Sequence, residues 1–219
     1  MDKQRDIFET WFARWRGVRT PAEEAAVLAF ADAYDRAIES GNLQPEQLNE
    51  VVAAASSSRA LLWKNAVDLL ARLAVRWEAA LDAVETMFAS KQSQVRFAAI
   101  CCLRADTPVI VANRLLLQGL TDKSSRVRWM AAQKASDFDR KELLPHLEAA
   151  FSIENNAKAR RSIDFHLRLL RDGYIVENST PAGYYFTVRI KDGIVSRYVT
   201  DEAMKTNGID AIAAEMRRN

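Results

Sequence analysis

The stretch Val95-Arg96-Phe97-Ala98-Ala99 returns 32 residues later as Val127-Arg128-Trp129-Met130-Ala131-Ala132. The same step backward reaches Trp63-Lys64-Asn65-Ala66-Val67, and the same step forward reaches Ala159-Arg160-Arg161-Ser162-Ile163. One column of the four copies is therefore always basic, and it holds Lys64, Arg96, Arg128 and Arg160. Each copy predicts one helix, and after a short break a second helix follows it. A repeat of this length built from pairs of helices predicts an α-solenoid.

The clearest copy reads Asp122-Lys123-Ser124-Ser125-Arg126-Val127-Arg128, an acidic turn followed by Val-Arg and small residues at helical spacing. This motif resembles HEAT repeats, in particular the short HEAT-like type. The resemblance covers about residues 57–172. Two copies depart from the pattern, because Ser90 stands at the place of Asp122 and Trp63-Lys64 replaces Val-Arg. The resemblance implies a solenoid, and it implies binding to proteins, nucleic acids or lipids more often than chemistry.

Helical signals also fill residues 1–56, which we expect to pack on the solenoid. An apolar stripe marks an opening helix that stops near Gly17, and it consists of Phe8, Trp11, Phe12 and Trp15. Thr20-Pro21-Ala22-Glu23 is a capping box for a helix that ends near Ser40 and Gly41. Pro45 begins the next helix, and Ser56-Ser57-Ser58 ends it. Within the repeats, Thr107-Pro108 and a second capping box, Asp139-Arg140-Lys141-Glu142, predict two further helix starts.

Residues 173–219 predict a small ββα cap. Two β-rich runs, 184–190 and 194–200, flank Asp192-Gly193, and Pro181-Ala182-Gly183 is a turn before them. Tyr184, Phe186, Val188 and Ile190 form the face expected to pack on the solenoid. The opposite face carries Tyr185, Thr187 and Arg189, joined by Arg197 or Tyr198 according to the register, and could be a contact patch. The predicted fold class is thus mostly α: a HEAT-like α-solenoid (57–172) with a small C-terminal β-hairpin plus helix cap.

Composition excludes several classes of function. The chain has 219 residues, 49% of them hydrophobic and 27% charged, with a net charge of +2. Its seven glycines are isolated, so the glycine-rich nucleotide-binding motifs and the serine-hydrolase elbow are absent. Cys101 and Cys102 are neighbours and predict no disulfide framework, and His146 and His166 lack ligand spacing for zinc. We expect no cofactor, no metal, no catalytic residue and no membrane partner, and a cytoplasmic location.

Two sets of residues are candidate sites. The basic column is either a partner-binding face or a structural ladder in which each arginine reaches the acidic turn of a neighbouring copy, with Asp122 and Glu154 as partners. A further basic and aromatic patch consists of Arg126, Trp129, Lys158 and Arg161. It could bind nucleic acid through stacking and phosphate contacts, form an ordinary charged helix face, or contact an acidic protein.

The sequence favours a non-catalytic, protein-binding scaffold or adaptor, and one form of it is a bacterial immunity protein that neutralises a toxin. The alternative is a nucleic-acid-binding protein. Its enzymatic version resembles the HEAT-like alkylpurine DNA glycosylases, with Trp63, Trp129, Asp68 and Asp164 as the residues of interest. No spacing singles out one of these carboxylates as catalytic.

Overall fold

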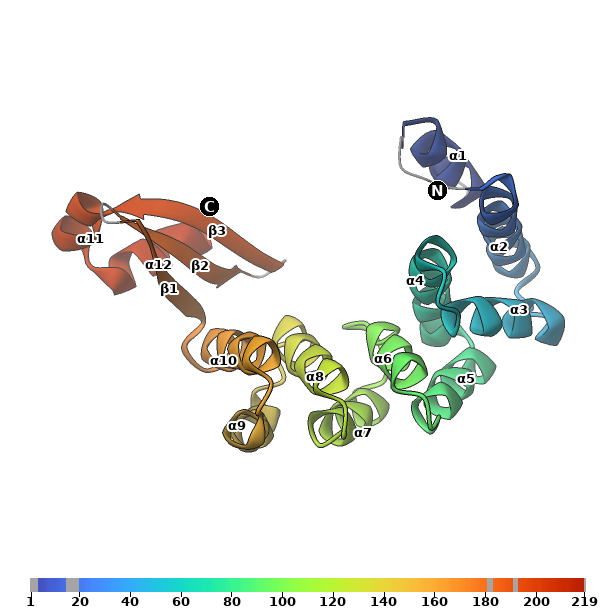
Figure 1. Ribbon diagram of the computed structural model, residues 1–219. Coiled ribbons are helices and arrows are strands. Elements are labelled where there is room, and N and C mark those ends of the chain that lie inside the picture. The colour runs from blue at the N-terminus through green and yellow to red at the C-terminus, as the bar shows by residue number, and fades with distance from the viewer. Residues whose placement is uncertain (1–3, 15–19, 181–182, 191–192, 219) are drawn as a thin grey trace. The chain divides into compact units, whose positions relative to one another are not determined.

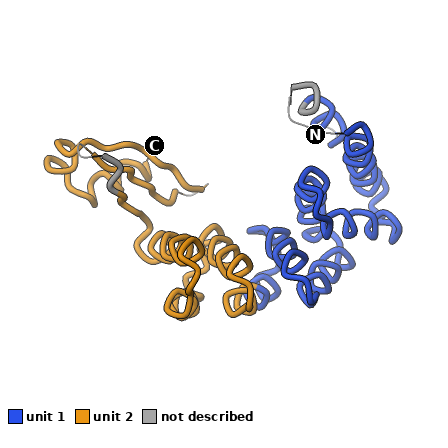
Figure 2. The backbone as a smooth tube through the Cα atoms, viewed as in Figure 1, with its two compact units in different colours: residues 1–115 blue, residues 116–219 orange. Residues whose placement is uncertain are grey.

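The computed structural model describes residues 4–14, 20–180, 183–190 and 193–218. These residues are mostly helical, with one small antiparallel sheet near the C-terminus (Figure 1). The predicted fold class, mostly α with a small C-terminal β element, is therefore confirmed. Residues 1–115 form one compact unit and residues 116–219 form another (Figure 2). No described helix combines the length and the apolar character that a membrane crossing requires.

The first unit is built from consecutive helices. They are α1 (Gln4–Arg14), α2 (Pro21–Ser40), α3 (Pro45–Ala55), α4 (Ala60–Arg76), α5 (Glu78–Phe88), α6 (Ser93–Cys101) and the first part of α7 (Val109–Leu120). Helix α2 packs on α1 and α4, and α4 also contacts α3, α5 and α6. The core of this unit includes Val27, Leu69, Leu70 and Ile100, which are all fully buried.

The ends of α2 are those that the sequence predicts. Thr20 Oγ1 accepts a hydrogen bond from the Glu23 amide (3.2 Å), and Glu23 Oε2 accepts one from the Thr20 amide (3.0 Å). Gly41 then adopts the left-handed conformation (φ +69°) that ends the helix. The helix that begins at Pro45 is also confirmed.

The apolar stripe of the opening helix is described only in part. Phe8 is buried on α1, in agreement with its predicted role in the core. Trp11 and Phe12 belong to α1, but their side chains lie outside the described residues, as do Trp15 and Gly17.

The second unit carries the remaining helices and the sheet. Its elements are α8 (Ser125–Asp137), the 3₁₀ helix η1 (Lys141–Leu143), α9 (Leu144–Ile153), α10 (Ala157–Asp172), β1 (Tyr174–Thr180), β2 (Gly183–Ile190), β3 (Gly193–Thr200), α11 (Asp201–Asn207) and α12 (Ile209–Arg218). Helices α8 and α10 begin 32 residues apart and pack side by side, as the repeat predicts. Two small residues of α8, Ala131 and Ala132, are fully buried.

The second predicted capping box is wrong. Asp139 has a left-handed backbone (φ +51°), whereas a helix N-cap has an extended one. The Arg140 amide donates to the Ala135 carbonyl (2.9 Å), so Asp139 closes the end of α8 instead. Helix α9 begins later, at Leu144, with Pro145 in its first turn.

The sheet has the order β1-β2-β3, so the predicted hairpin of β2 and β3 gains a strand that the sequence did not predict. Thr180 pairs with Gly183, and Ile190 pairs with Gly193. The predicted turn residues Pro181, Ala182 and Asp192 themselves lie outside the described residues.

The hairpin face that holds Phe186 and Val188 packs on α12 rather than on the repeat helices, which corrects the sequence expectation. Both side chains are fully buried in one cluster with Ile212 and Met216. The closing helix α12 is amphipathic and follows the sheet after the short helix α11, so it covers this face locally.

Candidate functional site

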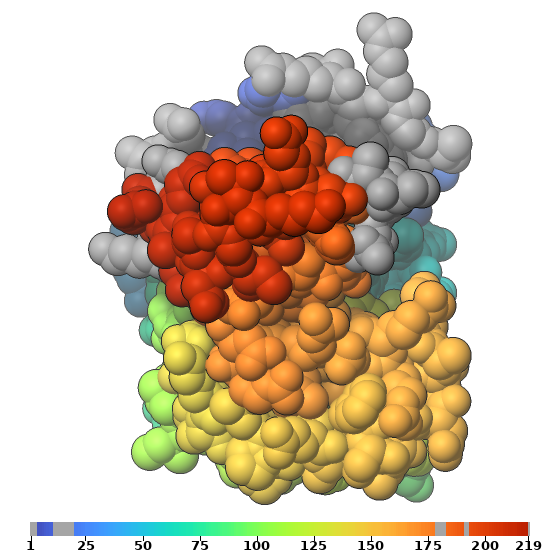
Figure 3. Space-filling model, turned by 90° about the vertical axis from the view of Figure 1, so that its left-hand side faces the viewer, coloured from blue at the N-terminus to red at the C-terminus, as the bar shows by residue number. Residues whose placement is uncertain are grey.

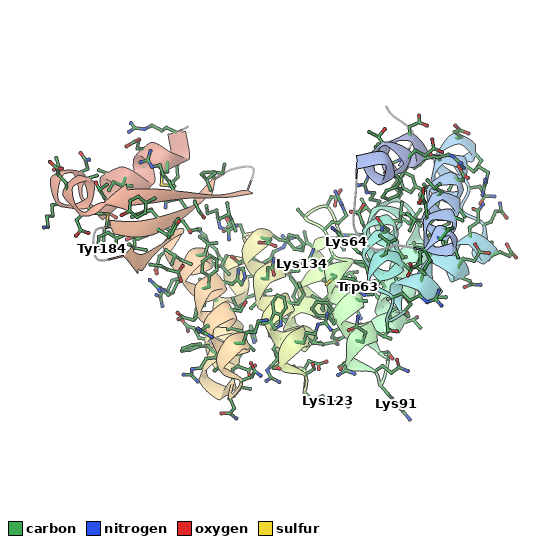
Figure 4. The ribbon with its side chains drawn as sticks, turned by 45° about the horizontal axis from the view of Figure 1, so that its top comes forward. Trp63, Lys64, Lys91, Lys123, Lys134 and Tyr184 are labelled. Atoms are coloured by element: carbon green, nitrogen blue, oxygen red, sulfur yellow. The ribbon has the colours of Figure 1, made fainter. Side chains whose placement is uncertain are left out.

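The arginines of the basic column bind the turns that precede their own helices. In the first unit, the buried Arg96 donates from Nη1 to the carbonyls of Ser90 and Lys91, both at 2.9 Å. The arginine of the Val-Arg pair, Arg96, therefore holds the turn before α6 in place. Lys91 itself is exposed in this turn, and its side chain extends away from the ribbon in Figure 4.

The same contact recurs in the second unit, at the same spacing of six residues. Arg128 Nη1 donates to the Asp122 carbonyl (2.6 Å), and Arg160 Nη1 donates to the Glu154 carbonyl (3.1 Å). Arg160 also lies over the ring of Phe151, 4.3 Å from its centroid. Each of these arginines thus holds the turn of its own copy, whereas the ladder interpretation expects a contact with the turn of a neighbouring copy.

Arg128 and Glu154 connect two successive copies. Arg128 Nε and Nη2 lie 2.8 and 2.7 Å from Glu154 Oε2, and the Glu154 side chain is 1% exposed. The other carboxylate oxygen accepts from the Asn156 amide (2.8 Å). Glu154 therefore ties α8 to the turn before α10, as the ladder predicts for this pair.

Lys64 departs from the column. It is exposed on α4, whereas the next residue, Asn65, is buried and donates to the Leu61 carbonyl (2.8 Å). Figure 4 labels Lys64 beside Trp63 on this helix. The contact of Asn65 stays within α4, so the first copy has no counterpart among the described contacts to the arginine bonds that hold the turns of the later copies.

Three of the four residues of the basic and aromatic patch lie together. Arg126, Trp129 and Lys158 line one surface pocket of about 410 Å³. The other lining residues are Ser125, Asn156 and Ala159. Arg161 is exposed on α10 but does not line this pocket. We refer to the six lining residues as the α8/α10 pocket.

The repeat explains why these side chains meet. Arg126 and Lys158 occupy the same place in consecutive copies, in the first turns of two helices that pack side by side. Asn156 caps α10, because its Oδ1 accepts from the amides of Lys158 (3.1 Å) and Ala159 (3.0 Å). Ser124 precedes α8 and makes no equivalent side-chain cap. The pocket therefore lies at two helix N-termini.

The electrostatics of the α8/α10 pocket favour a negative group. The N-terminus of a helix carries a partial positive charge, and Arg126 and Lys158 add two full charges. No acidic residue is among the described residues that line the pocket. The partly exposed indole of Trp129 adds a flat apolar surface beside these cations.

Sequence reasoning missed Ser125 and Asn156 as members of this pocket. A signal for Asn156 was present, because asparagine immediately before a helical run is a typical N-cap. Ser125 carried no such signal, since a serine in a polar turn is common at any surface.

The contact patch predicted on the sheet is smaller than expected. The register places Tyr198 opposite Tyr185, and the two exposed rings lie edge to face with centroids 5.9 Å apart. Thr187 is buried and hydrogen-bonds Ser196 (2.9 Å). Arg197 lies on the other face, where it binds Glu215 of α12 (3.0 Å).

The residues considered for glycosylase-like chemistry have ordinary surroundings. Asp68 pairs with Arg72 (2.9 Å), and Asp164 lies 3.9 Å from Arg168, each along its own helix. Trp63 stacks on Phe97 with ring centroids 5.8 Å apart. Across the described ranges, no three His, Cys, Asp or Glu side chains gather in a way that could hold a metal ion.

The two histidines differ in their environments. His146 is exposed in α9, whereas His166 is buried in α10. Burial, followed by the charge of Arg189, lowers the pKa of His166 to about 4. Cys102 is buried and Cys101 is partly exposed, and both are free thiols.

No protein-family model matches this sequence, and no curated protein matches it either.

Proposed function

We propose that this chain is a non-catalytic binding module of the HEAT-like type, and that its α8/α10 pocket receives an acidic segment of a partner protein. The observation that carries the proposal is the gathering of Arg126, Trp129 and Lys158 around one surface pocket. The described residues that line this pocket include no carboxylate. A cytoplasmic scaffold, adaptor or toxin-neutralising immunity protein would use such a pocket in the same way.

The proposed partner follows from the chemistry of the pocket. Two cations at two helix N-termini attract carboxylates, and the indole of Trp129 can cover an apolar or aromatic side chain next to them. Arginine and tryptophan are also the side chains most often found at the energetic centre of protein interfaces. An acidic segment with one large apolar residue fits this combination.

A tagged pull-down from native cells, with and without nuclease, tests the class of partner. The proposal expects a stoichiometric protein that stays bound after nuclease treatment. The double variant Arg126→Glu/Lys158→Glu should weaken its binding by at least about tenfold, since charge pairs at an interface each contribute 1 kcal/mol or more. Unchanged affinity in this variant would contradict the proposed site.

A matched control reverses two exposed cations elsewhere in the same unit. Lys205→Glu/Arg218→Glu changes the net charge by the same amount on α11 and α12. It should leave the affinity within about twofold, apart from a general effect on association rate. Far-UV circular dichroism of both double variants checks that the helices are intact.

Trp129 favours one second candidate, nucleic-acid binding. A tryptophan beside two cations can stack on a base while the cations contact phosphates. Fluorescence anisotropy with labelled single- and double-stranded oligonucleotides would then show binding that weakens steeply between about 50 and 200 mM salt. If such binding is found, assays of damaged-base excision with Asp68→Asn and Asp164→Asn variants test the glycosylase-like version.

A further inference from the structure

A second, smaller pocket lies in the second unit where four segments meet. The turn after α8, the C-terminal end of α10, strand β2 and helix α12 surround a volume of about 270 Å³. Figure 3 shows the surface of this part of the chain, with the C-terminal segment in red above α10 in orange. Its lining includes the cations Lys141, Arg171, Arg189 and Arg217 and the carboxylates of Asp139 and Asp172. We call it the arginine pocket.

Two of the cations in the arginine pocket have no carboxylate partner among the residues that the structure describes. Arg171 is paired with Asp172 through two contacts of 2.9 and 3.0 Å, so these charges offset each other. Within the described part of the chain, no ion pair includes Lys141 or Arg217. The pocket therefore keeps a surplus of positive charge.

Arg189 adds a guanidinium that is largely buried and short of acceptors among the described residues. Its side chain is 15% exposed, Nη2 donates to Ser136 Oγ (2.7 Å), and Nε lies 3.8 Å from Asp139 Oδ1. Nε is buried and has no hydrogen-bond acceptor among the described residues. A buried charged donor group with few acceptors is costly, and a bound anion would reduce that cost.

The backbone around the arginine pocket is arranged to bring the cations in. Asp139, with its left-handed backbone, turns the chain so that Lys141 faces the pocket. Gly173 is also left-handed (φ +76°), and a Cβ on it would lie 2.8 Å from Arg217 Nη2. A side chain at position 173 would therefore displace the Arg217 guanidinium.

We infer that the arginine pocket binds a phosphate group, either as free phosphate or as the monoester of a small molecule. A phosphate oxygen pair matches the planar donor fork of a guanidinium, and lysine adds a point charge. Lys141, Arg189 and Arg217 supply these donors from η1, β2 and α12. A phosphate bound there would join α12 to the end of the helical repeats within this unit. The inference is independent of the α8/α10 pocket.

Isothermal titration calorimetry with inorganic phosphate tests the inference. Chloride keeps the ionic strength constant. The wild-type chain should bind one phosphate saturably, and Lys141→Gln/Arg217→Gln should weaken binding by about tenfold or more, because two charge-assisted hydrogen-bond partners are lost. The control Arg126→Gln/Lys158→Gln removes the same charge from the α8/α10 pocket and should change the affinity less than about twofold. Titration with glycerol phosphate then separates the two sources, since a monoester site binds it more tightly than free phosphate.

Equal weakening in both double variants, or no saturable binding to the wild-type chain, would overturn the inference. The cations would then serve only to offset the negative C-terminal end of α10. Should the Lys141→Gln/Arg217→Gln variant fail to fold, NMR of the wild-type chain decides. Phosphate should shift the Nε–H signals of Arg189 and Arg217, and unchanged signals would reject the site.

Discussion

Glu154 Oε2 lies 2.7 Å from Arg128 Nη2, and this ion pair joins two consecutive repeats at a position where the carboxylate is 1% exposed. The main-chain carbonyl of the same Glu154 accepts from Arg160. One acidic residue therefore holds the arginine of its own copy and the arginine of the copy before it. The residues two positions earlier in the same copies, Arg126 and Lys158, line the surface pocket.

Glu154→Gln should lower the free energy of unfolding by about 3 kcal/mol, because it leaves the largely buried Arg128 without its counter-charge. Urea unfolding followed by circular dichroism measures the change. The control Glu148→Gln removes an exposed carboxylate from α9 and should cost less than about 0.5 kcal/mol. A similar small loss for both variants would show that the pair does not stabilise the fold.

The free energy of unfolding should decrease as the pH is lowered, because of His166. Its pKa in the folded chain is about 4, below the ordinary value of 6.5, so the folded state disfavours the protonated imidazole. Above pH 6.5 the imidazole is neutral in both the folded and the unfolded chain, so its burial does not reduce the free energy of unfolding. The free energy of unfolding decreases as the pH falls towards 4, by about 3 kcal/mol in total.

Comparison of two variants isolates this effect from the titration of carboxylates. His166→Leu should flatten the decline in the free energy of unfolding between pH 6.5 and 4, measured by urea titrations at each pH. His146→Gln changes an exposed imidazole and should keep the wild-type slope. A wild-type slope in His166→Leu would be inconsistent with a buried neutral His166.

Asn156 allows binding and stability to be separated. Asn156→Asp keeps an acceptor for the amides of Lys158 and Ala159, so the unfolding free energy should stay within about 0.5 kcal/mol. The new carboxylate lies in the α8/α10 pocket, so it should lower the affinity for an acidic partner by about tenfold. Asn156→Ala should do the reverse, with a loss of about 1 kcal/mol in stability and little change in affinity. Thermal unfolding and titration of the isolated partner measure the two quantities.

The packing of the sheet on α12 is tested by Phe186→Ala. Phe186 is fully buried against Ile212 and Met216, so its truncation should cost about 3 to 5 kcal/mol. Tyr185→Ala removes a neighbouring aromatic ring from the exposed face and should cost less than about 1.5 kcal/mol. Hydrogen exchange should show lost protection in β2 and α12 for the first variant only. Equal protection in both variants would contradict this packing.

Much of the helical architecture could be predicted from local patterns. The step of 32 residues places the starts of α6, α8 and α10 at Ser93, Ser125 and Ala157, because the helices that follow each turn repeat the same apolar spacing. The capping box of Thr20 and Glu23 could be predicted for the same reason, since its partners are three residues apart in the chain. The similar box at Asp139 failed because its residues close one helix before the next begins.

The sequence by itself thus determined the repeat, its period and the class of residue in each column. The tertiary structure alone decided which cations are used inside the fold and which line a pocket, because a helical position does not specify the partner that comes from another element. Arg189 shows the reason most clearly: its hydrogen-bond acceptor, Ser136, is 53 residues away in the chain. Strand β1 and the packing of β2 on α12 were decided in the same way, by contacts that no local spacing records.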